Sequence, residues 1–231
     1  MFDIRTKNKK NKLNNICLNA EKLLENDNEL DTHTIYMIIK ALTNLEYNKE
    51  IYDTLSNEKK HKPVIKFYDL FPTSDYLYKK DGKSITFLDI MYSNQLPIYE
   101  TVKLGYDPVY ACPWNTERLI NNMNNITGLW KQDENHDPLL FLPYGITIIN
   151  SGNHSATVGY LRNQGQLNVD KVYNISEVHR YVYTDGIYYY RKSDNSICSK
   201  VKNFNFAIIF ALGELIYNSS KKIKFHGIEV N

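Results

Sequence analysis

The sequence predicts an α+β protein with a small mixed sheet and flanking helices, preceded by a helical N-terminal region. Apolar residues recur at helical spacing near the N-terminus, and short β-type runs separated by turn residues fill the centre. A nearly uniform apolar stretch, residues 206–217, lies near the C-terminus and predicts a buried helix. We therefore divide the chain into a helical part, residues 1–62, and a mixed α/β domain, residues 63–231.

Composition and charge indicate a globular protein without a strong electrostatic preference for one partner. The chain has 231 residues, of which 42% are hydrophobic and 23% charged, and its net charge is +2. A charge this small does not by itself point to nucleic acid. The three cysteines lie far apart, which argues against a disulfide framework and favours a reducing cytoplasm. No run of about twenty apolar residues is present, so no membrane-spanning segment is expected.

Two amphipathic helices are predicted in the N-terminal part. Apolar residues recur at helical spacing over 13–24 and again over 35–45, and either Asp31 or Thr32 is the expected cap of the second helix. The basic residues 1–12 are expected to form a frayed, solvated start rather than an arm that binds nucleic acid.

The N-terminal part is expected to end in a loop. A third, weaker helical pattern runs through 51–55 and ends before Pro63, because the residue before a proline disfavours helix. The charged run 58–62 is interpreted as a surface loop or linker, and residues 64–105 as a loop-rich approach to the sheet. The sheet itself is therefore expected to begin after this region.

The central part alternates strand and helix patterns. Residues 107–112 predict a buried strand, after which Asn115 is expected to cap a helix that turns Leu119, Met123 and Ile126 inward. Two short strands follow over 139–142 and 145–150, with a second helix after them that ends near 163.

The last third of the chain carries the clearest hairpin pattern. Residues 167–173 alternate as one strand, and residues 180–184 and 187–191 flank Asp185-Gly186, a favoured two-residue turn. The hairpin is rich in tyrosine, which could stack nucleic acid bases, but cross-strand aromatic pairing explains these residues without a ligand. The apolar stretch 206–217 then supplies the buried helix.

The segment 145–161 predicts an anion-binding turn. Its strand ends at Asn150, Gly152 permits a backbone turn that other residues resist, and Asn153 or Ser155 can cap a helix whose free N–H groups point outward. These N–H groups and the helix dipole favour a phosphate or carboxylate. His154 lies at the lip of the turn, where an imidazole can bind the anion or move a proton. The alternative is a tight cap with a solvated His154.

A second polar segment, Trp130 to Asp137, precedes the two central strands. It contains Asp133, Asn135 and His136, and its place in the chain makes a shared site with His154 geometrically easy. A carboxylate that orients one imidazole, with a second imidazole to receive a proton, supplies the parts of acid–base or phosphoryl-transfer chemistry. The alternative is that Asp133 and Asn135 only form a turn and that His136 is a solvated loop residue.

The sequence Gly152-Asn153-His154-Ser155, between a strand and a small-residue helix closed by Gly165, resembles a known motif. It is similar to the Gly-x-His-Arg box of the ParB/sulfiredoxin superfamily, in which a strand, turn and helix bind nucleotide phosphates. The resemblance implies a ParB/sulfiredoxin-like fold for residues 63–231 and a phosphate site at the box. Ser155 stands where the superfamily has arginine, so the bidentate guanidinium clamp is missing there.

A wider stretch, roughly residues 107–217, resembles an uncharacterised bacterial family. The resemblance rests on three blocks in order: Pro-Trp-Asn at 113–115, Trp-x-x-Asp-x-Asn-His at 130–136 and Gly-Asn-His-Ser at 152–155. It supports the same site residues without naming a reaction.

Several residues are expected to hold the ligand. Trp114 and Trp130 can stack a base and Arg118 can reach its phosphates, although either tryptophan can equally anchor helix packing. The histidines lack the spacing of a closed zinc site, so the expected cofactor is Mg²⁺ held mostly by nucleotide phosphates. The predicted catalytic residues are His154, His136 and Asp133, and the predicted ligand-binding residues are Gly152, Asn153, Ser155, Trp130, Asn135, Trp114 and Arg118.

The sequence therefore predicts an enzyme that binds a nucleotide or another phosphate-bearing small molecule and performs hydrolysis or phosphoryl transfer at the Gly152–Ser155 turn. Two alternatives stay open. One is a nucleic-acid-binding protein or nuclease, and the other is a non-catalytic phage or mobile-element protein whose partner is another protein.

Overall fold

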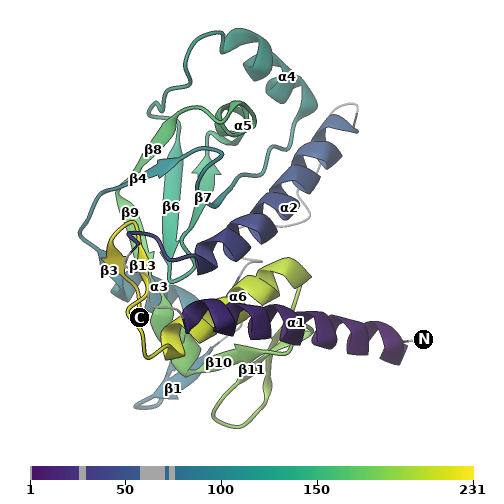
Figure 1. Ribbon diagram of the computed structural model, residues 1–231, viewed down its shortest axis with the longest axis vertical. Helices are drawn as coiled ribbons and strands as arrows, with labels where there is room; N and C mark the ends of the chain where they lie inside the picture. The colour runs from purple at the N-terminus through teal and green to yellow at the C-terminus, as the bar shows by residue number, and fades with distance from the viewer. Residues whose placement is uncertain (1, 26–29, 58–70, 73–75) are drawn as a thin grey trace.

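The fold is seen in a computed structural model of the 231-residue chain, which describes all residues except 1, 26–29, 58–70 and 73–75 (Figure 1). Helices surround a central mixed sheet, and further strands form small two- and three-stranded sheets at its periphery. The predicted α+β class, with a helical N-terminal region, is confirmed.

The central sheet has five strands in the order β3-β9-β6-β7-β5. β6 and β7 form an antiparallel hairpin, whereas β5 runs parallel to β7 and β9 runs parallel to β6. The strands at 139–142 and 145–150 that the sequence predicted are confirmed as β6 and β7. The strand bounds are β3 Gln95–Leu96, β5 Val109–Tyr110, β6 Asp137–Leu142, β7 Ile146–Ser151 and β9 Lys171–Asn174.

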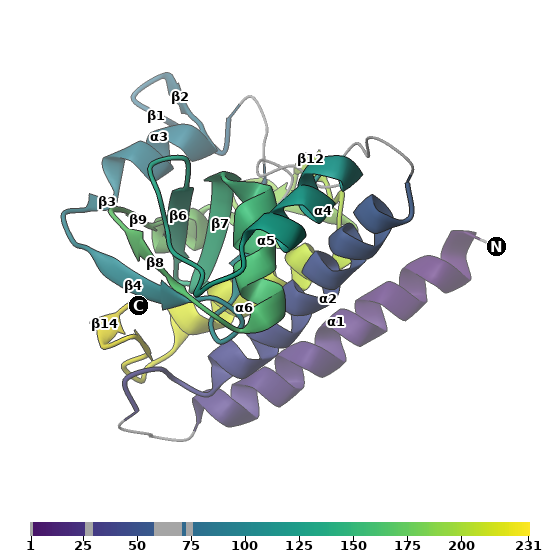
Figure 2. The same ribbon diagram turned by 90° about the horizontal axis from the view of Figure 1, so that it is seen from above.

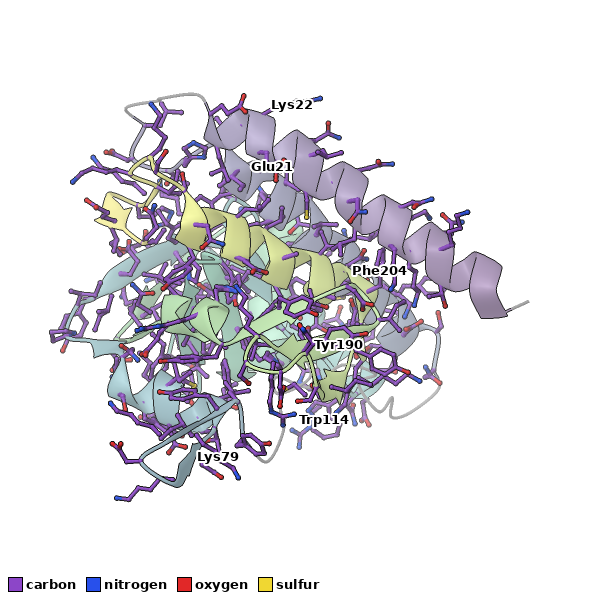
Figure 3. All side chains as sticks on the ribbon, turned by 90° about the horizontal axis from the view of Figure 1, so that it is seen from below. Glu21, Lys22, Lys79, Trp114, Tyr190 and Phe204 are labelled. Atoms are coloured by element: carbon purple, nitrogen blue, oxygen red, sulfur yellow. The ribbon has the colours of Figure 1, made fainter. Side chains whose placement is uncertain are left out.

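Three long helices cover the sheet and one another. α2 (Ile35–Leu55) contacts β5, β7 and α6 (Phe204–Asn218), and α1 (Phe2–Leu24) lies across α6 (Figures 1 and 2). α6 is buried along most of its length, as its uniform apolar sequence predicted. Figure 3 shows Phe204 at the start of α6 beside α1, where the ammonium group of Lys9 lies 5.5 Å from its ring. No helix of the described part of the chain is both long and apolar enough to cross a bilayer.

The N-terminal helices differ from the prediction in three ways. Residues 2–12 are not frayed but form the first half of α1, and Lys10 pairs with Asp185 at 2.8 Å. The predicted third helix is the end of α2, which continues unbroken to Leu55. The run 58–62 and Pro63 lie outside the described residues.

Neither predicted cap of α2 forms. The N-cap residue is Thr34, whose side chain makes no capping hydrogen bond. The backbone N–H of Ile35 instead donates to Nδ1 of His33 at 3.1 Å, and Thr32 Oγ1 accepts from the backbone N–H of His226 at 3.1 Å. The Thr32 side chain therefore binds the C-terminal β13–β14 hairpin, residues 224–229, and does not cap α2.

The region predicted to be rich in loops contains more regular structure than expected. A hairpin, β1 (Tyr78–Lys80) and β2 (Lys83–Ile85), is followed by α3 (Phe87–Ser93) and β4 (Glu100–Lys103). α3 begins with a capping box, because the Thr86 hydroxyl accepts from the Asp89 N–H while the Asp89 carboxylate accepts from the Thr86 N–H. The short apolar run after Ile85 is therefore a helix and not part of a loop.

The single strand predicted over 167–173 is two strands in two sheets. β8 (Gln166–Val169) pairs with β4 in a separate antiparallel ribbon, and β9 joins the central sheet after a break at Asp170. One alternating pattern covers both strands, so it could not reveal the change of sheet.

The tyrosine hairpin is confirmed, with a turn one residue later than predicted. β10 (Val182–Thr184) pairs with β11 (Tyr188–Arg191) so that Thr184 faces Tyr189, which centres the turn on Gly186-Ile187. The Asp185 carboxylate accepts from the N–H groups of Ile187 and Tyr188 at 2.9 Å each and thereby holds the turn that follows β10. The rings of Tyr183 and Tyr190 stack across the strands at 5.2 Å, as cross-strand pairing predicted.

The remaining elements complete the fold around these layers. They are α4 (Thr116–Asn125), α5 (Asn153–Arg162), a 3₁₀ helix over Ser176–Arg180, β12 (Ile197–Lys200), β13 (Lys224–Phe225) and β14 (Ile228–Glu229). Tyr47 of α2 and Thr157 of α5 share a buried hydrogen bond of 2.9 Å, which ties the N-terminal part to the helix after the predicted turn.

The β13–β14 turn is fastened by a histidine between two carboxylates. His226 Nδ1 lies 3.1 Å from Glu100 Oε1, and its Nε2 lies 3.1 Å from Asp107 Oδ1. Burial lowers the pKa of His226, but the hydrogen bonds and charges of Asp107 and Glu100 outweigh burial and place this pKa above its usual value.

His226→Gln is expected to destabilise the protein most at acidic to neutral pH. A raised pKa means that the stabilisation is fully present below the unfolded value of about 6.5 and is lost as the pH rises through the folded value. We expect a loss on the order of 2 kcal/mol at about pH 6, the scale of hydrogen bonds to charged groups, and a smaller loss at about pH 9. Denaturant titrations of both proteins measure this difference, and an equal loss at both pH values would contradict it.

Candidate functional site

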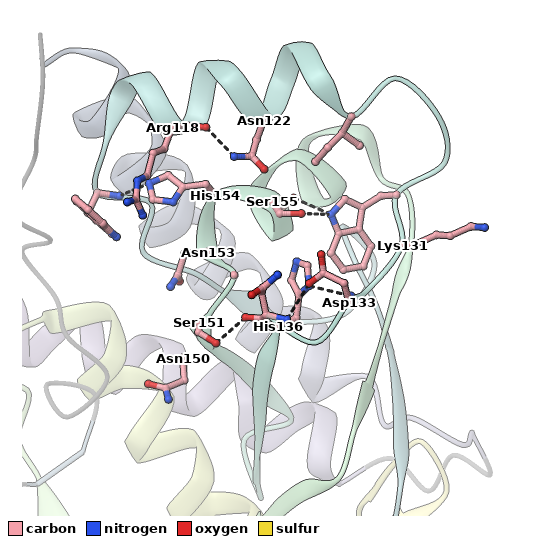
Figure 4. A pocket seen from close by; sticks show the side chains of 15 residues that line it. Arg118, Asn122, Lys131, Asp133, His136, Asn150, Ser151, Asn153, His154 and Ser155 are labelled. Carbon is pink, nitrogen blue, oxygen red and sulfur yellow. Dashed lines mark hydrogen bonds and ion pairs between the residues drawn. The ribbon is translucent and has the colours of Figure 1, made fainter.

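A pocket of about 630 Å³ lies between α4, the N-terminus of α5 and the loop before β6 (Figure 4). We call it the α5 pocket. It brings together all of the site residues predicted from the sequence: Asp133, His136, His154, Gly152, Asn153, Ser155, Trp114, Arg118, Trp130 and Asn135.

Gly152 makes the turn from β7 into α5. It is the N-cap residue and has φ +81°, the left-handed region that favours glycine. A Cβ at this position would also lie 2.6 Å from Cδ2 of the His136 ring, so no side chain fits. No described side chain caps α5, so the N–H groups at the start of the helix, whose residues line the pocket, have no side-chain acceptor.

The predicted caps Asn153 and Ser155 have other partners, so the prediction that either caps α5 is wrong. Asn153 Oδ1 accepts from the backbone N–H of Cys112 at 2.8 Å. Ser155 accepts the indole N–H of Trp130 through its backbone oxygen at 2.8 Å and its hydroxyl at 3.0 Å. Both side chains therefore hold neighbouring segments against α5.

His136 and Asp133 form a carboxylate–imidazole pair. His136 Nδ1 lies 2.7 Å from Asp133 Oδ1, which also accepts from the backbone N–H of Asn135 at 2.9 Å. The backbone nitrogen of Asp133 lies 3.1 Å from the same Nδ1, but the shorter contact with the carboxylate, which can only accept, places the proton on Nδ1. Burial acts to raise the pKa of Asp133, and the hydrogen bonds from Asn135 and His136 lower it by more.

The other nitrogen of His136 is left as an unused acceptor. The His136 side chain is only 1% exposed, and its Nε2 is buried with no hydrogen-bond partner among the described residues. A buried acceptor without a donor costs roughly 1–3 kcal/mol unless a ligand or water satisfies it. His136 is therefore not the solvated loop residue of the alternative reading.

His154 is buried rather than solvated. Its Nε2 accepts from the backbone N–H groups of Trp114 at 3.3 Å and Asn115 at 3.2 Å. Burial, with a smaller contribution from the charge of Arg118, lowers the pKa of His154 to about 4. The ring is therefore neutral at physiological pH with its proton on Nδ1, and its one lone pair is already in use.

α4 brings a cation to the pocket. Asn115 caps this helix as predicted, because its Oδ1 accepts from the Arg118 N–H at 2.8 Å. The Arg118 guanidinium lies 5.0 Å from the centre of the Trp114 ring, whose edge meets His154. Figure 4 shows Arg118 on one side of the α5 pocket and Lys131 on the other, where the Lys131 side chain extends away from the other residues drawn. Neither forms an ion pair with another described residue.

Trp130 forms a wall of the pocket. It is 3% exposed, its indole N–H is bonded to Ser155, and its ring meets His136 edge-on at 4.9 Å. The ring also fills the space beside Gly159 and Gly165, where a Cβ would collide with it. Its large apolar surface is thus used mainly for packing.

The sequence missed part of the lining: Asn122, Ile126, Lys131, Asn150 and Ser151. Lys131 lies inside the quoted 130–136 block, and Asn122 is one helical turn after Arg118, so both positions carried a usable signal. Across the described residues, no group of three His, Cys, Asp or Glu side chains is placed to hold a metal ion.

Gly152→Ala is expected to lower the free energy of unfolding by more than the matched substitution Gly82→Ala does. Gly82 has a similar φ of +77° but open space where a Cβ would be, so Gly82→Ala measures the backbone term alone, about 1 kcal/mol. Contact with the His136 ring adds to this term, and we expect roughly 3 kcal/mol for Gly152→Ala in denaturant unfolding. Equal losses for the two variants would show that the close approach of His136 is not a constraint.

His154 is expected to remain neutral down to about pH 5, because its pKa is held near 4. Histidine side-chain ¹⁵N spectra should show the Nδ1–H tautomer throughout that range. The unfolded state binds the proton more readily, so His154 destabilises the fold as the pH falls from about 6.5 towards 4. A midpoint near 6.5 for this ring would refute the assignment of Nε2 as an acceptor.

Comparisons with known proteins identify a family but no activity. No curated protein and no solved structure matches the chain. One family model matches residues 3–223, a range that includes both the helical N-terminal part and the whole α5 pocket. The chain belongs to this family, DUF6710, which is described as a family of unknown function.

Proposed function

We propose that this protein is an enzyme that binds a nucleotide or another phosphate-bearing ligand and performs hydrolysis or phosphoryl transfer at the Gly152–Ser155 turn. One observation carries the proposal. The uncapped N-terminus of α5 and the His136 ring line the same pocket, and Nε2 of that ring is buried with no hydrogen-bond partner among the described residues. Free amides attract an anion, and an unused imidazole acceptor attracts a proton.

The binding half of the proposal assigns the anion to α5 and Arg118. The first amides of α5 and the helix dipole favour negative charge, by typically 0.3–1 kcal/mol and up to about 2 kcal/mol in partly buried sites. The Arg118 guanidinium, on α4, supplies the planar cation that Ser155 cannot. Lys131, also in the lining, adds positive charge on the other side of the pocket.

The chemical half of the proposal assigns proton transfer to His136. Its Nε2 accepts a proton from water or from a hydroxyl as that oxygen attacks the phosphorus, and Asp133 stabilises the imidazolium that forms. The P–O bond to the leaving group breaks, and the leaving oxygen departs with the electron pair and is protonated by solvent. His154 cannot act as the base through Nε2, which is bonded to two backbone amides, and so contributes a neutral Nδ1–H donor. General-base catalysis of this kind contributes about 10²–10⁴ in rate.

Mg²⁺ remains the expected cofactor if the ligand is a nucleotide. Asp133 is the carboxylate in the lining of the pocket, and it can join phosphate oxygens around the ion. The ion would neutralise charge on the phosphates.

Arg118→Ala is expected to weaken binding of inorganic phosphate or a nucleotide at least about tenfold, because hydrogen bonds to charged groups are worth about 1.5–3 kcal/mol. Arg162→Ala is the matched control, since Arg162 lies on α5 outside the pocket and bonds the backbone oxygen of Gly128. Calorimetric titration with Mg²⁺ present measures both. If no nucleotide or phosphate is bound or consumed by the unmodified protein, the proposed function is wrong.

His136→Ala is expected to lower turnover about 100-fold or more while the ligand still binds. Asp133→Asn should lower it by less, since it removes the orienting charge but keeps the base. His226→Gln, which changes a histidine outside the pocket, should retain turnover. Unchanged turnover in His136→Ala would reject His136 as the base.

A nuclease would use the same groups on a phosphodiester, and the two cations of the pocket lining, Arg118 and Lys131, suit either ligand. Binding of single- and double-stranded nucleic acid that weakens steeply with salt would favour that alternative over a small ligand.

A further inference from the structure

A second cavity, of about 510 Å³, adjoins the α5 pocket and shares Trp130 and Lys131 with it. We call it the β4–β8 cavity, because residues of that ribbon line it: Lys103, Gln166 and Asn168. Tyr106 and Leu129 complete its sides. Trp130 and Lys131 thus form a divider between the two hollows.

The divider cannot easily move. Trp130 is bonded to α5 through Ser155, and Gln132 is bonded in both directions to the backbone of Asn168, at 3.1 Å from its amide nitrogen and 2.6 Å to its oxygen. These bonds hold the 130–132 segment between α5 and β8. Lys131 lies between the two anchored residues and lines both hollows, so a ligand that fills both would pass this lysine.

The lining of the β4–β8 cavity differs in kind from that of the α5 pocket. Two large apolar side chains are left exposed at it, Tyr106 at 63% and Leu129 at 75%. The side-chain amides of Asn163, Gln166 and Asn168 also border it and form no hydrogen bond within the described part of the chain. It contains no carboxylate and no imidazole among its lining residues.

The exposed Tyr106 ring with side-chain amides beside it matches a nucleobase, whose faces stack on aromatic rings and whose edge both donates and accepts hydrogen bonds. The α5 pocket, with its open helix amides and Arg118, suits phosphate instead. The two hollows adjoin at Trp130 and Lys131, as the base and the phosphates of one nucleotide are joined through its sugar.

We propose that the β4–β8 cavity is a base-binding subsite and that the ligand is a nucleoside phosphate whose phosphates lie at the N-terminus of α5. This inference rests on the proposed function, since it assumes that phosphate binds in the α5 pocket.

The test compares ligands with and without a base. Calorimetric titration of the full chain with tripolyphosphate, ATP and GTP, each with Mg²⁺, should show at least one nucleotide binding about tenfold more tightly than tripolyphosphate. Tenfold is near the low end of what stacking of one base contributes. Tyr106→Ala should remove most of this advantage and leave tripolyphosphate binding unchanged, and Gln166→Ala should reduce the preference between the two nucleotides.

Tyr99→Ala is the matched control, because Tyr99 is 85% exposed and lines neither hollow. The subsite is overturned if tripolyphosphate and both nucleotides bind equally, or if Tyr106→Ala weakens all three alike. In those cases the proposed function stands, provided that Arg118→Ala still weakens tripolyphosphate binding. If none of the three probes binds, both proposals fail.

Discussion

The site depends on a backbone conformation that only glycine adopts without strain. Gly152 changes the chain direction from β7 to α5 in a single residue with positive φ, and the His136 ring occupies the space that a side chain there would need. Because of this turn, α5 begins without a cap and His136 lies directly beneath its first residues. The open amides and the buried imidazole are thus two consequences of the same constraint.

The residues after Gly152 each hold a different segment in place. Asn153 bonds to the backbone of Cys112, His154 to that of Trp114 and Asn115, and Ser155 to the indole of Trp130. The groups suited to chemistry come mainly from the held segments and the loop that follows Trp130: Arg118, Lys131, Asp133 and His136. The motif that first indicated a site therefore assembles the site more than it supplies its reactive atoms.

The sequence predicted the convergence of the site residues well and their individual contacts poorly. The order of the motifs along the chain was enough to place the loop at 130–136 beside the turn at 152–155. The loop precedes β6 and the turn follows β7, and these two strands pair antiparallel, so the start of one lies beside the end of the other. Capping was mispredicted at Asn153, Ser155 and Thr32 because each oxygen has a long-range donor that local sequence does not reveal. Asn115, whose partner is three residues away, was predicted correctly.

The difference between local patterns and long-range partners also explains most errors in the predicted fold. α2 and the buried α6 follow from local periodicity, although the end of α2 at Leu55 was taken for a separate helix. The division of 166–174 into β8 and β9 depends on partners in β4 and β6 that lie far away in sequence. The hairpin turn lies one residue later than predicted. The Asp185 carboxylate accepts hydrogen bonds from the two amides of Ile187 and Tyr188, and the strand propensities of the residues do not reveal these bonds.

The wall of the α5 pocket gives the protein a built-in optical reporter. The chain has two tryptophans, Trp114 and Trp130, and both line this pocket. Trp114 faces the Arg118 cation and Trp130 meets the His136 ring, so the emission of both indoles responds to changes in charge and protonation at the site. Fluorescence excited selectively at tryptophan, and not at the 19 tyrosines, therefore reports on this pocket, so that occupancy can be followed without any attached dye.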